Sequence, residues 1–381
     1  MKKVAIIHNM PLEYYPPTIN QLNILGDSKV LNIRVWTSSN DRLNSYENDK
    51  ISQIVRFPFT TIKDSKLRRV FKYLHFNLMT LFGLIVFNPD RVYYFESYSA
   101  WPVYWYSKLI NKKVLISKHC HEYFDPEWYK QGMRLVRKNY QYEKSYLYPK
   151  ADWISHTNTD RISLFLKDHS NVSPVIVKHL PNYPPKSWAE VSIKKDSPKT
   201  PLTREKEKIK LVYIGSVSLV DTYLEKLCEF VSLNSDRISL DIYSYNYHED
   251  AKTYLSRFTH DAIKFFGNGI QYNLIPKTLI EYDIGIIMYK VNTLNCDYCA
   301  PNKLFEYLSC GLDVWVSKEQ TGCQPYLQTE SQPFVKAIDY NKLSPDLILD
   351  YYNLLSKDLP VVELDFYYES VIDELLNHLE M

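Results

Sequence analysis

Alternating strand and helix patterns run through this sequence twice, with a break between the two runs. Short stretches rich in β-branched and aromatic residues, such as 4–8 and 91–96, are followed by longer helical stretches, such as 66–87. Strands that alternate with helices in this way form a parallel sheet covered on both faces. The break, residues 181–208, begins Pro-Asn-Tyr-Pro-Pro and is then poor in apolar residues. The pattern predicts two α/β domains joined by a polar connection.

The chain length agrees with this division. A chain of 381 residues exceeds one ordinary core and suits two domains of roughly 150–200 residues each. We expect a first domain at 1–185, a connection at 186–208, a second domain at 209–360 and a terminal segment at 361–381. Within that segment Val371, Ile372, Leu375, Leu376 and Leu379 fall on one face of a helix, so the helix is expected to dock on its own protein.

Composition excludes several classes of protein. Lys and Arg number 46 against 44 Asp and Glu, so no strong field favours nucleic acid as a partner. Six cysteines are too few for a disulfide scaffold, and the single Cys296-x-x-Cys299 pair is not read as a metal site. No secretory signal is recognised, and the apolar run 76–87 is shorter than the roughly 20 residues that a membrane span needs. We expect a cytoplasmic protein.

The segment 300–314 has the pattern of an anion site. Pro301 suits the first position of a helix and Gly311 suits its end. Free backbone N–H groups in the first turn, the helix dipole and the Lys303 charge would attract phosphate; those N–H groups belong to Asn302, Lys303 and Leu304. Glu306, one turn deeper, could accept hydrogen bonds from two ribose hydroxyls. The residues predict a nucleotide-diphosphate holder, or alternatively a short amphipathic helix with Glu306 at a solvated edge.

Four further motifs accompany this segment in chain order. Pro-Asn-Lys-Leu-Phe-Glu-Tyr-Leu-x-x-Gly at 301–311, preceded by 283–289, resembles the donor-site region of glycosyltransferase family 4 and its relatives of GT-B fold. Residues 213–218 (Tyr-Ile-Gly-Ser-Val-Ser) resemble the glycine loop of their second domain. Residues 119–123 (His-Cys-His-Glu-Tyr) resemble their histidine motif, and 179–183 the end of their first domain. The resemblance covers nearly the whole chain.

The resemblance implies a fold and a donor site. The fold is two Rossmann-like domains facing a cleft, with a C-terminal helix that returns to the first domain. Glu306 would bind the ribose of a nucleotide sugar, and the amides of Lys303 and Leu304 would hold the diphosphate. Gly215 would allow close approach of the phosphates, as its missing Cβ also suggests. Other donor-binding candidates are Ser216, Ser218, Asn268, Ile270 and Asn302, with the loop 267–270 bordering the base.

The histidine motif supplies the candidate catalytic residues. His121 matches the position that faces the donor sugar, where it could stabilise charge as the glycosidic bond breaks. Glu122 could orient a hydroxyl or end a strand. His119 is a rival for this role, because side chains two apart point to the same face of a strand. A core histidine is the alternative for His121.

Two departures from the family pattern bear on donor binding. Many members carry an acidic residue eight before the ribose ligand, where this chain has Tyr298; Asn295 or Asp297 could replace it. Members also often carry Arg and Lys after the glycine loop, where this chain has Ser216 and Asp221 and the nearest cation is Lys226. Diphosphate binding would then rest on Lys303, the helix N-terminus and the hydroxyls of Ser216, Ser218 and Thr222. These departures predict weaker donor binding or an unusual donor.

The first loop, 9–17, leaves the opening strand at its carboxyl end. Its aromatic residues could stack on an acceptor sugar, and the acceptor-side candidates are Asn9, Glu13, Tyr14 and Tyr15. Glu13 is a candidate acid or base, with a solvated loop carboxylate as the alternative. A basic stretch at 56–72 could rest against an anionic membrane, or be an ordinary solvated helix face; it comprises Arg56, Lys63, Lys66, Arg68, Arg69 and Lys72.

The leading hypothesis is a glycosyltransferase of the hexosyltransferase, polysaccharide-biosynthesis type. It would move a sugar from a nucleotide-sugar donor to a hydroxyl of a glycan or lipid-linked glycan acceptor. The resemblance implies retention of anomeric configuration, no cofactor and no obligatory metal. Two alternatives are a nucleotide-sugar epimerase of the same architecture and a non-catalytic partner subunit with a degraded donor site.

Overall fold

The computed structural model describes residues 1–40, 45–61, 64–192, 208–258 and 262–381. The chain divides into two compact units, 1–182 with 368–381 and 183–367. The sequence placed these boundaries at 185 and 361, so both shift by a few residues. Of the expected connection 186–208, residues 193–207 lie outside the described residues, and Ser187–Ser192 forms helix α8 of the second unit.

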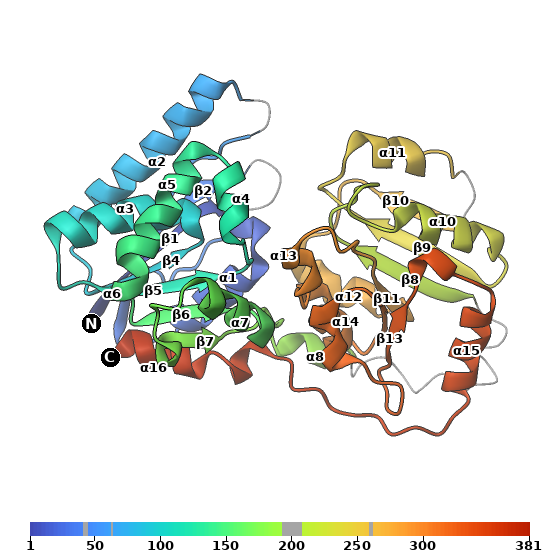
Figure 1. Ribbon diagram of the computed structural model, residues 1–381. Helices are drawn as coiled ribbons and strands as arrows, with labels where there is room; N and C mark the ends of the chain where they lie inside the picture. The colour runs from blue at the N-terminus through green and yellow to red at the C-terminus, as the bar shows by residue number, and fades with distance from the viewer. Residues whose placement is uncertain (41–44, 62–63, 193–207, 259–261) are drawn as a thin grey trace. The chain divides into compact units, whose positions relative to one another are not determined.

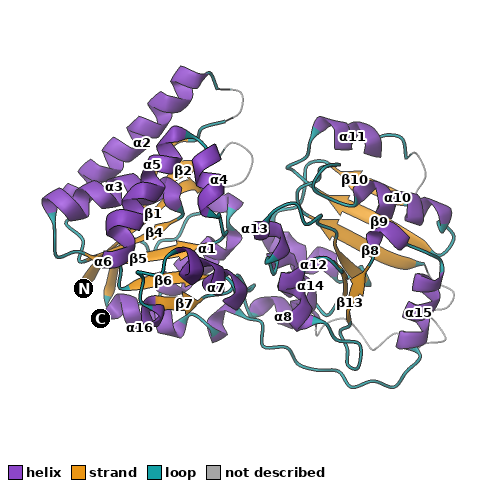
Figure 2. Ribbon diagram, viewed as in Figure 1, coloured by secondary structure: helices purple, strands orange, loops and turns teal. Residues whose placement is uncertain are grey.

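The first unit contains a seven-stranded parallel sheet in the order β3-β2-β1-β4-β5-β6-β7 (Figures 1 and 2). The strands are β1 Lys2–Pro11, β2 Leu31–Ser39, β3 Gln53–Pro58, β4 Arg91–Phe95, β5 Leu115–Cys120, β6 Trp153–His156 and β7 Val177–His179. The helices are α1 Pro16–Gly26, α2 Lys66–Phe87, α3 Ala100–Trp105, α4 Pro126–Gln131, α5 Arg134–Tyr142, α6 Tyr148–Lys150, α7 Thr159–Asp168 and α16 Asp373–Glu380. Short helical turns are η1 Leu12–Tyr14, η2 Ser97–Ser99, η3 Tyr106–Ile110, η4 Glu143–Leu147, η5 Pro174–Ile176 and η9 Tyr368–Ser370.

The second unit contains a six-stranded parallel sheet in the order β10-β9-β8-β11-β12-β13. The strands are β8 Ile209–Ile214, β9 Ile238–Tyr243, β10 Ile263–Phe266, β11 Ile284–Ile287, β12 Asp313–Ser317 and β13 Val335–Ile338. The helices besides α8 are α10 Leu224–Leu233, α11 Glu249–Leu255, α12 Ile275–Leu279, α13 Leu294–Asp297, α14 Asn302–Ser309 and α15 Asp346–Leu355, with turns η6 Tyr272–Leu274, η7 Thr321–Tyr326 and η8 Tyr340–Lys342. The predicted α/β class, with two parallel sheets, is confirmed.

Strand register in the first unit places four polar or aromatic side chains in one row. Phe95 of β4 pairs with His8 of β1 on one side and with His119 of β5 on the other. His119 in turn pairs with Ser155 of β6. Laterally paired residues of a parallel sheet point to the same face, so this row marks the carboxyl edge of that face.

The terminal helix α16 belongs to the first unit, as the resemblance implied. Leu375 and Leu379 are buried, and Glu374 pairs with Lys178 of β7 at 2.6 Å. The guanidinium of Arg91 lies 2.7 Å from Nε2 of His378. Apolar burial, the Glu374–Lys178 ion pair, the Arg91–His378 hydrogen bond and the ring contact of His378 with Trp153 therefore fix α16 against strands β4, β6 and β7.

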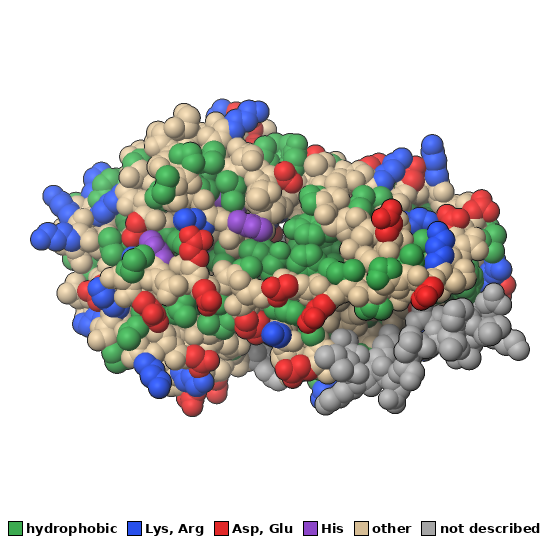
Figure 3. All heavy atoms as spheres, turned by 90° about the horizontal axis from the view of Figure 1, so that it is seen from below, with side chains coloured by type: hydrophobic (Ala, Val, Ile, Leu, Met, Phe, Trp, Pro, Cys, Tyr) green, Lys and Arg blue, Asp and Glu red, His purple; other side chains and the backbone are tan. Residues whose placement is uncertain are grey.

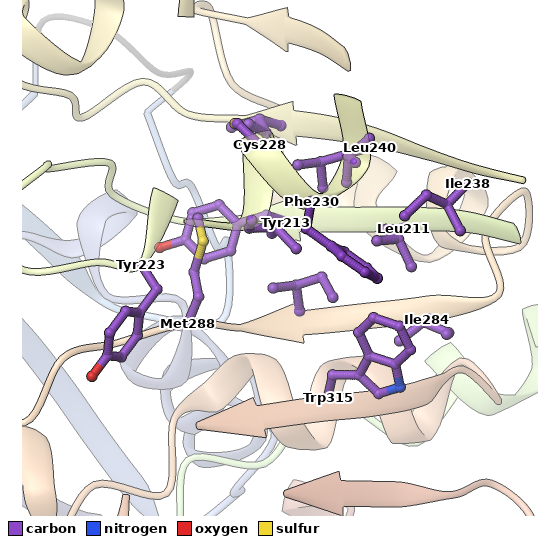
Figure 4. Packing of buried hydrophobic residues seen from close by; sticks show 14 of the residues in the cluster. Leu211, Tyr213, Tyr223, Cys228, Phe230, Ile238, Leu240, Ile284, Met288 and Trp315 are labelled. Atoms are coloured by element: carbon purple, nitrogen blue, oxygen red, sulfur yellow. The ribbon is translucent and has the colours of Figure 1, made fainter. Parts of the chain in front are cut away.

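The core of the second unit lies between its sheet and helices α10, α11 and α15. Tyr213, Ile284, Met288 and Trp315 are all fully buried or nearly so and belong to one cluster (Figure 4). Figure 4 shows these side chains meeting from β8, β11, the residue after β11, and β12. Because side chains alternate along a strand, Gly285 of β11 points to the opposite face, toward α14.

The absence of a side chain at Gly285 makes room for the ring of Tyr307. A Cβ built on Gly285 would lie 2.2 Å from Cδ2 of Tyr307, closer than atoms can approach. Helix α14 therefore packs directly on the backbone of β11, and its position depends on this glycine.

Helix α2 corrects one expectation about membrane segments. From the sequence, we considered only the apolar run 76–87 as a candidate membrane span. The helix extends over Lys66–Phe87 and is long and apolar enough to cross a membrane. A core helix can pass the same test, yet only 28% of the most apolar window is buried. On the face drawn in Figure 3, acidic and basic side chains are interspersed.

Substituting Gly285→Ala should destabilise the second unit. The added methyl must displace the Tyr307 ring or the β11 backbone, and overpacking of this kind costs about 1–3 kcal/mol of unfolding free energy. Urea denaturation would measure it, with Leu233→Ala as control because Leu233 is 84% exposed. An effect no larger than that of the control would contradict the packing argument.

Candidate functional site

Helix α14 begins one residue later than the sequence predicted. Pro301 is the N-cap, with φ −65° and ψ 146°, and the first helical residue is Asn302. The N–H of Leu304 donates to the carbonyl of Pro301 at 2.9 Å, so this amide is used by the helix itself. That contact argues against the expected role of the Leu304 amide as a phosphate ligand. Gly311 follows the helix with φ +72°, a conformation that glycine adopts without strain.

Glu306 is buried, with 2% of its surface exposed, which excludes the solvated-edge alternative. Its Oε2 lies 2.5 Å from Nζ of Lys303, whose side chain is 20% exposed. A buried carboxylate needs a charged or hydrogen-bonding partner, and Lys303 supplies it. The expected ribose ligand and the expected phosphate ligand are therefore paired with each other.

Tyr213 accounts for the glycine of the loop after β8. A Cβ on Gly215 would lie 3.0 Å from the hydroxyl oxygen of Tyr213, and that hydroxyl donates to the carbonyl of Ser216 at 2.7 Å. A Cβ there would make a tight contact, so the glycine favours this placement of the Tyr213 side chain, whatever ligand approaches from outside. Ser216 itself is exposed.

Two other hydroxyls expected to bind phosphate take part in the turn that follows. The Oγ of Ser218 accepts from the N–H groups of Val220 and Asp221, each at 3.2 Å. The hydroxyl of Thr222 donates to the carbonyl of Ser218 at 2.6 Å. These contacts hold the loop and leave Ser216 as the exposed hydroxyl of the three.

Hydrogen bonds from backbone N–H groups join the glycine loop, the segment after β11 and helix α14. The N–H of Ile214 donates to the hydroxyl of Tyr307 at 3.0 Å. The N–H of Tyr223 donates to the carbonyl of Met288 at 2.8 Å, and the N–H of Lys290 donates to the backbone carbonyl of Asp221 at 2.9 Å. Three segments far apart in the sequence therefore meet at the carboxyl edge of β8 and β11, where ligands of such sheets bind.

Lys290 is a cation near the glycine loop that the sequence analysis missed. Its Nζ donates to the carbonyl of Leu219 at 2.7 Å, and its side chain is half-buried. Lys226, the cation considered from sequence, instead lies 3.7 Å from Glu229 on its own helix. The available signal was the position of Lys290 three residues after β11, because the carboxyl ends of adjacent parallel strands lie at the same edge of the sheet.

The other donor-side candidates lie in loops. Asn268 is exposed and Ile270 half-buried in the turn after β10, where Gly269 has φ +62°. Asn302 is half-buried at the start of α14. Asp297 accepts the N–H of Thr321 at 3.2 Å, so it ties α13 to η7.

Cys296 and Cys299 are not joined to each other or to another cysteine by a disulfide bond in the part of the chain that the structure describes. Over the residues that the structure describes, no group of three or more His, Cys, Asp and Glu could hold a metal ion.

In the first unit, His121 lies just beyond β5 among buried groups. Its Nε2 is 2.9 Å from the hydroxyl of Thr18, and its Nδ1 is 3.4 Å from Oδ1 of Asn182. Its ring stacks on Phe95 and makes an edge contact with His119. Only 4% of the residue is exposed, which agrees with the core-histidine alternative as well as with a catalytic role.

Burial keeps these histidines neutral. It lowers the pKa of His121 well below its usual value, that of His119 to about 3 and that of His8 to about 4. Desolvation penalises the charged imidazolium in each case, and the neighbouring rings add to the effect for His119 and His121. At neutral pH the ring of His121 is therefore neutral and can donate or accept a hydrogen bond.

Glu96, which the sequence analysis read only as the end of a strand, holds the histidine motif in place. Its Oε1 accepts the N–H of His121 at 2.6 Å and that of Glu122 at 3.2 Å. It is buried and has φ +53°, a region that residues with a side chain rarely adopt. Backbone strain of this kind costs about 1–3 kcal/mol and concentrates at functional sites. Burial raises the pKa of Glu96 to about 8.

Arg161 anchors the same segment from the other side. Its guanidinium donates to the carbonyl of His121 at 2.6 Å and to the hydroxyl of Thr157 at 2.8 Å. The backbone of His121 is thus held on both its N–H and its carbonyl. The side chain of Glu122 is exposed, so it is not fixed by burial.

The acceptor-side candidates divide into two groups. Tyr15 lies beside the rings of His8 and His121, with centroids 4.7 and 5.2 Å away. Tyr14 makes an edge contact with Phe59, and the N–H of Asn9 donates to Ser99. Glu13 is not a solvated loop carboxylate: it is buried and pairs with Arg56 at 2.9 Å. The structure therefore brings Tyr15, but not Glu13, to the histidines.

The raised pKa of Glu96 predicts a distinct pH dependence of stability. The folded state holds this proton more tightly than the unfolded state, so the contribution is full below about pH 4.5 and is lost as the pH rises to about 8. Glu96→Gln should remove this pH-dependent contribution. Between pH 5 and pH 8 the unfolding free energy of the wild type should therefore fall by at least about 1 kcal/mol relative to that of the variant. Urea denaturation across this range measures the difference, with Glu225→Gln as control. A constant difference would refute the assignment.

Comparison with known proteins gives the fold. No protein-family model matches the sequence, and no curated protein matches it. Among solved structures, sucrose-phosphate synthase from Thermosynechococcus elongatus aligns with TM-score 0.65 and 13% identity over 100% of this chain and 99% of that one. The Anabaena protein HepE in complex with UDP-glucose aligns with TM-score 0.67 and 10% identity over 99% of each chain. The UDP-GlcNAc 2-epimerase from Neisseria meningitidis aligns with TM-score 0.59 and 11% identity over 99% of this chain and 100% of that one. At such identities the likeness shows the fold alone, and the chain has the GT-B fold.

Proposed function

We propose that this protein is a glycosyltransferase that moves a sugar from a nucleotide-sugar donor to a hydroxyl of a glycan or lipid-linked glycan. The observation that carries the proposal is the buried Glu306–Lys303 pair at the N-terminal end of α14, held by Tyr307 beside the glycine loop. Solved structures of the same fold include complexes with UDP-glucose and with UDP. Both observations support a nucleotide sugar as the donor.

In this proposal the Glu306–Lys303 pair opens when the donor binds. Two ribose hydroxyls donate to the Glu306 carboxylate, which keeps that buried charge satisfied. The ammonium of Lys303 then turns to the diphosphate, where Lys290 and the hydroxyl of Ser216 join it. Lys290 supplies a positive charge near the glycine loop, although no cation follows that loop closely in the sequence. Donor binding should therefore be stronger than the sequence alone predicts.

The proposed reaction retains the anomeric configuration. The bond between the sugar C1 and the phosphate oxygen breaks, and the acceptor oxygen forms a new bond to C1. The acceptor proton passes to the departing phosphate. The neutral ring of His121, fixed through Glu96 and Arg161, stabilises the donor side by hydrogen bonding. We propose that the reaction needs no cofactor and no obligatory metal.

The same fold leaves a second candidate, a nucleotide-sugar epimerase, because the Neisseria enzyme is among the similar structures. Incubating the protein with a nucleotide sugar and no acceptor separates the two functions: an epimerised sugar would indicate the epimerase. A non-catalytic partner subunit would bind no nucleotide. Thermal stabilisation by a panel of UDP-, GDP-, dTDP- and CMP-sugars tests that case and identifies the donor, since a ligand that binds only the folded state raises Tm.

Separate contacts to ribose and phosphate predict different effects on binding. Glu306→Gln should weaken the binding of both the nucleoside and its diphosphate at least about tenfold, because hydrogen bonds to a charged group contribute about 1.5–3 kcal/mol. Lys303→Met and Lys290→Met should each weaken the binding of the nucleoside diphosphate about tenfold and leave the affinity for the nucleoside unchanged. Isothermal titration with the nucleotide found by the panel measures both. Lys226→Met is the matched control, and equal effects of all three lysine variants would defeat the assignment.

Replacing His121 tests the catalytic step. His121→Ala should lower kcat about 100-fold or more while the KM for the donor changes little, because the lost contact acts on the developing charge. His248→Ala, at an exposed histidine of the second unit, is the control. If His121 is only a core residue, the variant will instead show a lower Tm and full activity per folded molecule.

A further inference from the structure

The outer face of helix α2 is apolar along its whole length. A surface helix normally turns polar residues to water, whereas here every exposed residue except Lys66 and Arg68 is apolar. They recur at intervals of three and four and form the α2 stripe: Leu67, Val70, Phe71, Leu74, Leu78, Met79, Phe82, Ile85 and Val86. Phe71 is 70% exposed and Val86 64%. Exposed apolar patches of this extent mark binding surfaces.

The opposite face of α2 is packed on its own sheet. Phe76, Leu84 and Phe87 are buried in one cluster with Trp36 of β2. A Cβ on Gly83 would lie 2.5 Å from Nε1 of Trp36, so the helix is in close contact with that strand. Crossing a bilayer would require α2 to leave this core. The helix can instead offer only its outer face.

Basic side chains flank the stripe at both ends. Lys66 and Arg68 are exposed at its beginning, and α2 contains no acidic residue. At its end the hydroxyl of Tyr106 donates to Asn88 at 3.1 Å, which joins the turn η3 to the helix. That turn exposes Leu109 and Ile110 and is followed by exposed lysines at 112 and 113.

The basic stretch 56–72, which the sequence analysis considered as a membrane contact, is neutralised in part. Arg56 pairs with Glu13, and Asp64 pairs with both Lys72 at 2.7 Å and the largely exposed Arg68 at 3.2 Å. The hydrogen bond from Lys72 lowers the pKa of Asp64 to about 2, so this acid stays charged. Lys63 lies outside the described residues. Charge alone therefore does not define the surface.

We propose that the α2 stripe, continued by Leu109 and Ile110, lies in the interface of an anionic phospholipid bilayer with the helix parallel to the membrane plane. An interfacial helix buries its apolar face about 5–10 Å deep and gains from basic residues near anionic headgroups. A lipid occupant fits because the stripe offers no hydrogen-bonding group to a protein partner and has cations at its two ends. The inference does not depend on the proposed function.

Vesicle flotation of the full chain tests the proposal. The wild type should float with phosphatidylcholine vesicles containing phosphatidylglycerol, and a fraction should remain bound at high salt, since apolar burial is not screened. Phe71→Gln, Phe82→Gln and Val86→Gln together should reduce the bound fraction at least about tenfold. The matched control carries Val175→Gln, Leu233→Gln and Val361→Gln, at apolar positions more than 60% exposed elsewhere, and should float like the wild type.

Three results would overturn the proposal. The first is a wild type that stays unbound, and the second is a triple α2 variant that floats as well as the control. The third is a wild-type dimer that the α2 variant converts to monomer without any vesicle binding, which would assign the stripe to a second copy of the chain. Equal Tm values for both triple variants show that the fold is intact. Release by alkaline carbonate separates an interfacial helix, as proposed, from a spanning one.

Discussion

The ring of Tyr307, seated over Gly285, is the contact on which the candidate donor site depends. It sets α14 directly on the β11 backbone, and its hydroxyl accepts the N–H of Ile214 at the start of the glycine loop. One residue before it, Glu306 is thereby held in a buried position beside Lys303. A single aromatic side chain thus aligns the helix, the strand edge and the loop. The chemistry proposed for Glu306 needs that alignment more than it needs any feature of the loop alone.

Most of the fold could be predicted from sequence because local signals agreed with one another. The predicted strands at 4–8 and 91–96 correspond to β1 and β4, and the helix predicted at 66–87 has those bounds in the structure. Helices α1, α8 and α15 and strand β13 were not foreseen. These segments begin near prolines, are polar or lack clear periodicity, so local sequence signals do not reveal them. Tertiary packing decides the structure of such segments.

The candidate site was less accessible, because its contacts join residues far apart in the chain. Glu306 and Lys303 belong to one short motif, so their closeness follows from helical spacing. Lys290 reaches Leu219 only through the pairing of two loop segments, and Glu96 reaches His121 only through the register of β4 and β5. The hydrogen-bond partners of side chains were equally hard to predict. No sequence pattern indicates that the hydroxyls of Ser218 and Thr222 form hydrogen bonds within their own turn.

The membership of 368–381 in the first unit has a consequence for biosynthesis. Strands β6 and β7 leave the ribosome long before α16 does, so Trp153 and Lys178 wait for their covering helix while the whole second unit is made. The first unit therefore cannot finish folding in the order of synthesis. Once residue 367 has emerged from the ribosome, the second unit has all its elements, while the first unit still exposes the strand edge that α16 will cover.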